Sequence, residues 1–306
     1  MKKILIALLS LNIFLSTTAC NSNTNKYKEI NLDEQDPDYI VAIDHGITDP
    51  DNNIRKLIYD GKPITVKYYM DCYREAAEFG LVIFVNGIRQ PYYFNNEKKE
   101  TLMKTLSFER HERKDFSITF KPVMGKTGDI LSVIFSTVLE PRFINTDITK
   151  PIFAYYHNYS QQTPWILMIN RDIENSINPV YNKLNVEYKE PEEKVSFETN
   201  FTANNSEVYI SPRNGKLFLD FDLYLPTEDL YCFLLFINHQ LIPIDGCLYH
   251  EVFSKSNCYT KWSVEIDWNE DEDTFLYGLL IPINNEITMQ DTIYRTESKL
   301  LTKRGR

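Results

Sequence analysis

The sequence has little of what nucleic-acid and zinc binding require. Its 306 residues contain 33 Lys and Arg against 43 Asp and Glu, which gives a formal net charge of −10, and its one basic cluster is residues 303–306 at the very end. Binding to nucleic acid needs a basic surface, so the composition argues against that class of partner. The five histidines are scattered and no Cys-x-x-Cys is present. We therefore expect no zinc site and no cofactor.

Two catalytic or phosphate-binding motifs are also incomplete. No Gly-x-Ser-x-Gly elbow occurs, which removes the simplest serine-hydrolase interpretation but leaves open a triad assembled from distant residues. Residues 125–128 read Gly-Lys-Thr-Gly, but Phe120 stands where a phosphate loop has its first glycine, and no helical pattern follows. This segment is better explained as a turn between two antiparallel strands.

A calcium loop is matched only in part. Asp49, Asp51, Asn53 and Asp60 have the spacing of four ligand positions. Ile54, however, stands where such a loop needs glycine for its sharp turn, so we expect a solvated loop and no metal.

What the sequence does contain is one pattern that occurs twice. Residues 81–86 and 233–238 are apolar runs that end in Asn, and four residues separate each Asn from Pro91 or Pro243. Runs of this length bounded by turn residues indicate buried strands. Further strand patterns flank both copies, at residues 64–70 and 116–120 around the first and at 217–223 and 262–266 around the second.

The regular spacing of these strands indicates the fold class. About six or seven short strands per repeat, rich in aromatic and β-branched residues, are typical of an immunoglobulin-like sandwich. We predict an all-β protein with two tandem antiparallel immunoglobulin-like β-sandwich domains. The expected organisation is a signal peptide (1–19), a tether (20–38), a first domain with a C-terminal extension (39–188), a second domain (189–290) and a polar tail (291–306).

The first twenty residues have the order of an export signal. Lys2 and Lys3 precede an apolar run over residues 4–15, and small residues lead to Ala19 and Cys20. The run is too short to span a bilayer. Removal of residues 1–19 would change the formal charge from −10 to −12.

The junction of Ala19 with Cys20 resembles the lipobox of bacterial lipoproteins, although Thr17 stands where that family usually has Leu. The resemblance implies cleavage before Cys20, acylation of its thiol with chains such as palmitate, and attachment to the extracytoplasmic face of the cell membrane. The alternative is an ordinary secretory signal with a cysteine near its end. The abundance of Asn, Lys, Ile and Tyr resembles proteins of low-GC, mostly Gram-positive, bacteria.

Four cysteines follow Cys20. Cys247 and Cys258 have a spacing that suits a loop-closing disulfide in an exported protein. The competing interpretation is that these two, together with Cys72 and Cys232, are reduced and buried like small apolar residues.

Paired aromatic residues are the candidate binding surface. Tyr92 and Tyr93 follow Pro91, and Tyr155 and Tyr156 form a second pair. Their rings could stack on a carbohydrate or anchor a protein partner. The alternative is that they fill the core or form cross-strand pairs.

The shared residues Asn86 and Asn238 are predicted to be structural. Each side chain could accept a hydrogen bond from a backbone N–H two residues further on and close the turn toward the following proline. A shared ligand is disfavoured because Gly87 and His239, the next residues, differ greatly in bulk.

These observations favour a membrane-anchored binding or assembly module at the cell envelope rather than an enzyme. A surface hydrolase acting on glycan or peptide, and a structural spacer, are the alternatives. A pocket with converging carboxylates or a His–nucleophile pair would favour the hydrolase.

Overall fold

The computed structural model describes residues 41–48, 56–73, 75–123, 130–140, 159–161, 165–169, 181–191, 200–204, 209–268, 274–283, 293–296 and 299–301. Every regular element in these ranges is a β-strand. Among the same residues, none forms a helix long and apolar enough to cross a membrane. All the strands lie within Pro37–Arg306, which is one compact unit. The expected signal peptide, Cys20 and the tether lie outside the described residues.

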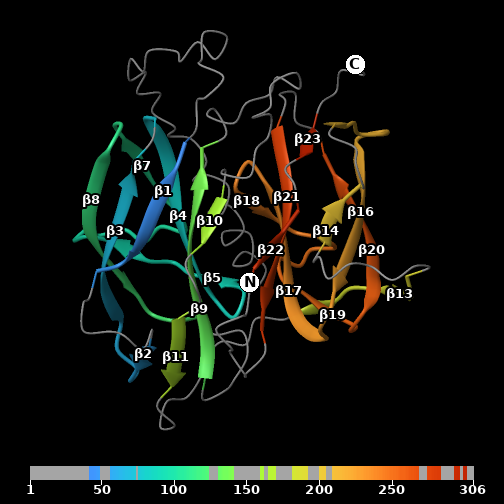
Figure 1. Ribbon diagram of the computed structural model, residues 1–306, viewed down its shortest axis with the longest axis horizontal. Coiled ribbons are helices and arrows are strands. Elements are labelled where there is room, and N and C mark those ends of the chain that lie inside the picture. Colours follow the sequence, from blue (N-terminus) through green and yellow to red (C-terminus); the bar gives the residue numbers. More distant parts are fainter. Residues whose placement is uncertain are drawn as a thin grey trace, which may run out of the picture. The chain divides into compact units, whose positions relative to one another are not determined.

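The first sandwich consists of two sheets, drawn in blue to green in Figure 1. Sheet 1 has the order β1 (Ile43–Ile47), β3 (Ile64–Cys72), β8 (Glu112–Phe120), β6 (Tyr93–Phe94). Sheet 2 has the order β2 (Lys56–Tyr59), β11 (Trp165–Ile169), β9 (Ile130–Leu139), β4 (Ala77–Val85), β5 (Ile88–Arg89), with β10 (Tyr159–Gln161) on β9 and β7 (Lys104–Phe108) on β4.

The second sandwich, in yellow to red, has the same construction. Sheet 3 has the order β12 (Asn182–Lys183), β19 (His250–Ser254), β17 (Asp229–Ile237), β21 (Thr274–Pro282), β23 (Lys299–Leu301), β15 (Tyr209–Ile210), with β18 (Gln240–Ile242) on β17 and β22 (Tyr294–Arg295) on β21. Sheet 4 has the order β13 (Glu187–Lys189), β20 (Cys258–Asp267), β16 (Lys216–Leu225), β14 (Asn200–Ala203).

The two sandwiches repeat one strand order. Strands β3, β8, β4, β9, β11 and β2 correspond to β16, β20, β17, β21, β23 and β15, and the last strand of each set pairs in parallel with its neighbour. Phe84 is opposite Ile134 across β4 and β9, and Phe236 is opposite Tyr277 across β17 and β21. The predicted fold class of two tandem immunoglobulin-like β-sandwiches is confirmed.

The core inside each sandwich is formed by every second side chain of its strands. Side chains of β3 and β8 alternate between the core and the exterior. In the first core, the Tyr68 ring centroid lies 5.2 Å from that of Phe135 and 5.8 Å from that of Phe116. In the second, Trp262 stacks on Phe221 at 5.4 Å. Aromatic packing of this kind supplies much of the apolar burial that holds the sheets together.

The central strands β4 and β17 are buried on both faces, which explains their unbroken apolar sequences. Ile83 faces the first core, whereas Val82 and Phe84 belong to a third apolar cluster together with Leu234 and Phe236. This third cluster lies between sheets 2 and 3. It therefore joins the two sandwiches.

The turns after the central strands complete this junction. A Cβ atom on Gly87 would lie 2.4 Å from the Cβ of Cys232. His239, the counterpart of Gly87, donates from Nε2 to the Leu139 carbonyl at 2.5 Å. Arg89 Nη1 donates to the carbonyl of His239 at 3.4 Å, so each turn contacts the other sandwich.

Asn86 and Asn238 are structural, but their partners differ from the prediction. Asn86 N donates to Ser132 O at 2.9 Å, and Ser132 N donates to Asn86 Oδ1 at 2.8 Å. Asn238 and Phe275 exchange the same two bonds, at 2.9 and 3.1 Å. The acceptors thus serve the neighbouring strand, not the turn. Both residues have φ near +45°, a conformation that Asn tolerates better than most residues.

Two segments correct the expected organisation. Residues 291–306 were expected to be a polar tail, but β22 and β23 lie there and pair with β21, and Leu301 is completely buried. Residues 182–188, expected in the extension of the first domain, include β12 and most of β13, which pair with β19 and β20 of the second sandwich. These strands are short and mostly polar, so the sequence did not predict their pairing.

Candidate functional site

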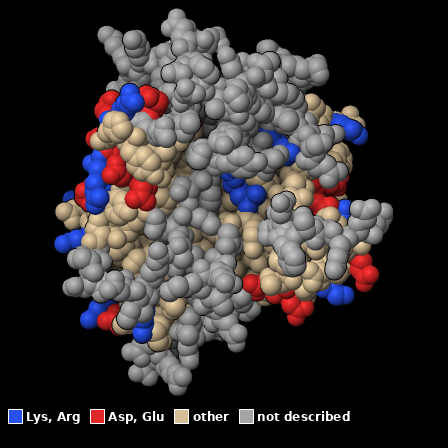
Figure 2. Space-filling view, viewed as in Figure 1, with Lys and Arg blue, Asp and Glu red and all other residues tan. Residues whose placement is uncertain are grey.

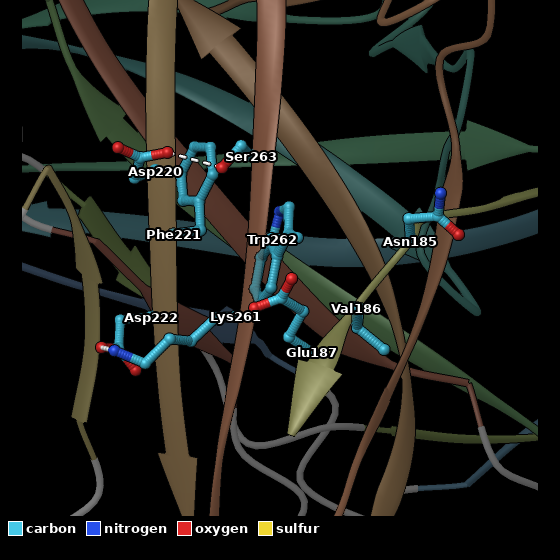
Figure 3. A pocket seen from close by; sticks show the side chains of 9 residues that line it. All are labelled: Asn185, Val186, Glu187, Asp220, Phe221, Asp222, Lys261, Trp262 and Ser263. Carbon is cyan, nitrogen blue, oxygen red and sulfur yellow. Dashed lines mark hydrogen bonds and ion pairs between the residues drawn. The ribbon is translucent and has the colours of Figure 1, made fainter. Parts of the chain in front are cut away.

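A groove of about 570 Å³ lies on sheet 4 of the second sandwich, where β13 begins beside β20 (Figure 3). Three segments line it: residues 185–187, 220–222 and 261–263. We call it the β20 groove. Its volume is within the usual range of ligand pockets, but its floor is a sheet surface with charged side chains.

Alternation along β16 and β20 places the polar side chains of the groove. Asp220 is opposite Ser263, and Asp222 is opposite Lys261. Ser263 Oγ donates to Asp220 Oδ1 at 2.5 Å, and Lys261 Nζ lies 2.7 Å from Asp222 Oδ2. Figure 3 shows both contacts bridging the two strands. The polar groups are therefore held by the sheet and do not depend on a loop.

The groove is acidic. Glu187 of β13 is opposite Lys261, and the residues that line the groove include three carboxylates and one ammonium group. The Asp222 side chain is 20% exposed, and its Oδ1 atom is buried with no hydrogen-bond partner. A buried carboxylate oxygen without a donor is unfavourable, so a ligand that donates there would be stabilised.

The inner wall is aromatic. Trp262 is 3% exposed and stacks between Phe221 and Phe201, at centroid distances of 5.4 and 5.8 Å. Its Nε1 atom is buried and has no acceptor. The indole is thus rigidly held while its one polar group remains unsatisfied.

A strap of residues 181–189 forms one side of the groove. β12 pairs in parallel with β19, and β13 pairs in antiparallel with β20, so the strap crosses from sheet 3 to sheet 4. Leu184 and Val186 pack against the second core between these strands. Tyr188, 42% exposed, donates from its hydroxyl to the Phe253 carbonyl at 3.0 Å.

The structure separates the predicted aromatic pair. Tyr92 is completely buried; its hydroxyl donates to Leu81 O at 2.7 Å and accepts from Lys104 N at 2.8 Å. Burial raises the pKa of Tyr92. The proposed surface role of Tyr92 is therefore wrong: it is a core residue that ties β4 to β7. Tyr93 is 36% exposed and lies opposite Thr119. Tyr155 and Tyr156 lie outside the described residues.

The expected Cys247–Cys258 disulfide is not formed, and both residues have thiols. Cys247 closes a tight turn with Ile244 and donates from Sγ to Tyr249 O at 3.4 Å. Cys258 is a buried residue at the start of β20, opposite Leu225. Cys247 therefore lies in the turn between β18 and β19 of sheet 3, whereas Cys258 begins β20 of sheet 4, a separation that the spacing in sequence could not reveal.

Three of the described histidines have structural contacts, whereas His111 is exposed. His45 Nδ1 and Tyr68 Oη are 2.6 Å apart, and His239 Nδ1 and Tyr277 Oη are 2.8 Å apart. His250 Nε2 donates to the Cys247 carbonyl at 3.0 Å. Within the described ranges, no group of three His, Cys, Asp or Glu side chains is arranged to hold a metal ion.

Charged side chains elsewhere are interspersed by sign, as Figure 2 shows for the described part of one face. Exposed pairs such as Arg113 with Asp115, at 3.0 Å, are screened by solvent and add little to stability. The β20 groove was not predicted from the sequence. The signal for it was the connection between Ile242 and His250, which has too few residues to form a counterpart of β6.

No protein-family model and no curated protein matches this chain. Among solved structures, the fibronectin(III)-like modules of Clostridium thermocellum CbhA are 6% identical with a TM-score of 0.22, covering 85% of this chain and 94% of that chain. The periplasmic chaperone SfaE is 9% identical at 0.23, covering 85% and 99%. The C-terminal domain of the Streptococcus agalactiae AgI/II polypeptide BspA is 8% identical at 0.22, covering 85% and 100%. Scores this low carry no argument about function.

Proposed function

We propose that the protein is a lipid-anchored binding module at the extracytoplasmic face of the cell membrane, with the β20 groove as its binding surface. The observation that carries the binding role is the groove itself. It combines an unsatisfied buried acceptor at Asp222, an unsatisfied buried donor at Trp262, and an acidic rim. Polar groups of this kind are usually paired in folded proteins, so they point to a partner that completes them.

The anchor is supported by the sequence around Cys20. A charged start, an apolar run of signal length and the Ala19-Cys20 junction together resemble a lipoprotein signal. Two or more acyl chains would hold the protein firmly at a membrane. Replacement of Cys20 by Ala should move the protein from the membrane fraction to the medium, whereas Ser22→Ala should leave it in place. Equal membrane retention of both variants would contradict the anchor.

The binding role is tested with two chemically different probes. Short extended peptides and soluble cell-wall glycan fragments are titrated against the chain and against the variant Asp220→Lys, which reverses one groove charge on the exposed face of β16. We expect at least one probe class to bind saturably and to bind at least tenfold more weakly to Asp220→Lys. As a control, Asp115→Lys changes the outer face of sheet 1 and should bind normally. If no binding depends on Asp220, the groove is not the binding surface.

A further inference from the structure

The two sandwiches differ at one strand edge. In the first, β6 pairs with β8 at residues 118–119, and Asn95 extends this pairing to Ser117. In the second, β20 is paired on the corresponding side only with β13, at residues 259–261. No described residue pairs with that side of β20 over residues 262–267. The second sandwich therefore has an open edge where the first is closed.

The length of one connection explains the difference. The chain between β5 and β7 runs from Arg89 to Lys104 and includes β6. The equivalent chain between β18 and β19 runs only from Ile242 to His250, and residues 244–247 of it form a tight turn. That turn leaves too few residues to reach sheet 4, so this connection supplies no counterpart of β6.

The first sandwich identifies which backbone groups are open in the second. Trp262 is opposite Phe221 as Phe116 is opposite Tyr68, so Ser263 corresponds to Ser117. The Ser117 N–H donates to Asn95 Oδ1 at 2.9 Å, and its carbonyl accepts from Asn95 N at 2.7 Å. Because backbone groups of successive strand residues point to alternate sides, the N–H and carbonyl of Ser263 face the open edge.

The first sandwich also shows what fills such an edge. Phe94 of β6 is 8% exposed, and its ring centroid lies 4.8 Å from that of Phe116. At the same place in the second sandwich, Trp262 Nε1 is buried and has no partner. An incoming strand would bring apolar surface to this position, as β6 does in the first sandwich, and could also place an acceptor near Trp262 Nε1.

The charges at the edge restrict the incoming strand further. Glu187 and Asp220 line the groove and form no ion pair with any other residue that the structure describes, whereas Lys261, the basic residue among those lining the groove, is already paired with Asp222. A basic side chain on the strand would be attracted to this rim, and an acidic one would be repelled.

We propose that the open edge of β20 accepts an extended segment of a partner protein as an added strand, with an aromatic or apolar side chain toward Trp262 and basic side chains beside Glu187 and Asp220. This inference rests on the proposed binding function and names the class of partner. Main-chain hydrogen bonds to Ser263 would hold the segment, and the groove would select its side chains.

The probe is the amidated peptide Lys-Tyr-Tyr-Phe-Asn-Lys, which places residues 92–95 of this chain between two lysines. Titration into the full chain should give saturable binding and slow the amide hydrogen exchange of Ser263 at least tenfold. The double variant Glu187→Lys/Asp220→Lys should weaken binding at least tenfold, while Asp115→Lys should not. The Asn95 N–H donates to the Ser117 carbonyl in the first sandwich. A peptide methylated on its Asn amide nitrogen cannot donate the equivalent hydrogen bond to the Ser263 carbonyl, so it should bind at least tenfold more weakly.

Three outcomes would overturn the inference. They are no binding of the peptide, binding without protection of Ser263, and equal binding of the methylated peptide. Protection of Ser263 that rises with protein concentration in the absence of peptide would assign the edge to a second copy of this chain instead. If a glycan binds the groove and depends on Asp220 while the peptide fails, the proposed binding function stands and the added strand does not.

Discussion

Gly87 of the first sandwich lies directly against Cys232 of the second, so closely that a Cβ on Gly87 would be 2.4 Å from the Cβ of Cys232. The counterpart of Gly87 is the bulky His239, and the counterpart of Cys232 is Gly80, so at both positions the first repeat has glycine and the second a larger residue. Cys232 packs against Gly87, and His239 reaches the Leu139 carbonyl of the first sandwich. The difference in size between Gly87 and His239 is thus a property of packing between the sandwiches.

Replacement of Gly87 by Ala should destabilise the protein for two reasons. Its φ of +81° is unfavourable for Ala, and the new methyl group would overlap Cys232. Gly246→Ala is the matched control, because Gly246 also has a positive φ, +74°, but open space around it. We expect Gly246→Ala to cost about 1 kcal/mol and Gly87→Ala about 2–4 kcal/mol, measured by urea unfolding. Equal costs would show that the contact with Cys232 is not tight.

Asn86→Ala should lower the free energy of unfolding by about 1–3 kcal/mol, because it leaves the Ser132 N–H without its acceptor. Asn238→Ala should have a similar effect through Phe275. The third apolar cluster joins the sandwiches, so either variant should shift one common calorimetric transition. Two resolved transitions, with only one shifted, would show that the sandwiches unfold independently.

The stability of the junction should depend on pH through His239. Burial, followed by the nearby charges of Arg89 and Arg295, lowers its pKa to about 4 from an unfolded value of 6.5. The unfolded chain therefore binds a proton between these values while the folded chain does not. Stability is fully present above pH 6.5 and falls as the pH drops toward 4, by up to about 1.4 kcal/mol per pH unit.

The variant His239→Gln isolates this contribution. Urea unfolding at pH 7 and pH 5 should show a smaller loss of stability in the variant than in the natural chain. The variant should retain some pH dependence, because burial also lowers the pKa of His250. An identical loss in both proteins would mean that His239 does not titrate as proposed.

Leu301 tests whether the end of the chain is part of the fold. It is completely buried in β23, so Leu301→Ala should cost about 2–5 kcal/mol. Ile58→Ala is a comparable control at a side chain that is 67% exposed, and it should change stability by no more than about 0.5 kcal/mol. A negligible effect of Leu301→Ala on stability would show that this segment is a tail and not part of the fold.

The fold class was predictable from sequence because β4 and β17 are buried on both faces and their apolar runs are unbroken. The roles of Asn86 and Asn238 were predictable, but their partners, Ser132 and Phe275, are 46 and 37 residues away and depend on strand register. β23 was missed because one buried apolar residue, Leu301, follows the polar Lys299. The β20 groove was missed because it depends on the pairing of β13 with β20, and the sequence indicates it only indirectly, through the short connection between Ile242 and His250.

The most direct test of the open edge is the amide hydrogen exchange of the ligand-free chain at the two equivalent serines. The Ser117 N–H is bonded to Asn95, whereas the Ser263 N–H faces the side of β20 that no described strand covers. Exchange at Ser263 should be at least about 100-fold faster than exchange at Ser117, since an amide without a hydrogen bond needs no opening of the structure to exchange. Equal protection at the two positions would contradict the open edge and, with it, the proposed added strand.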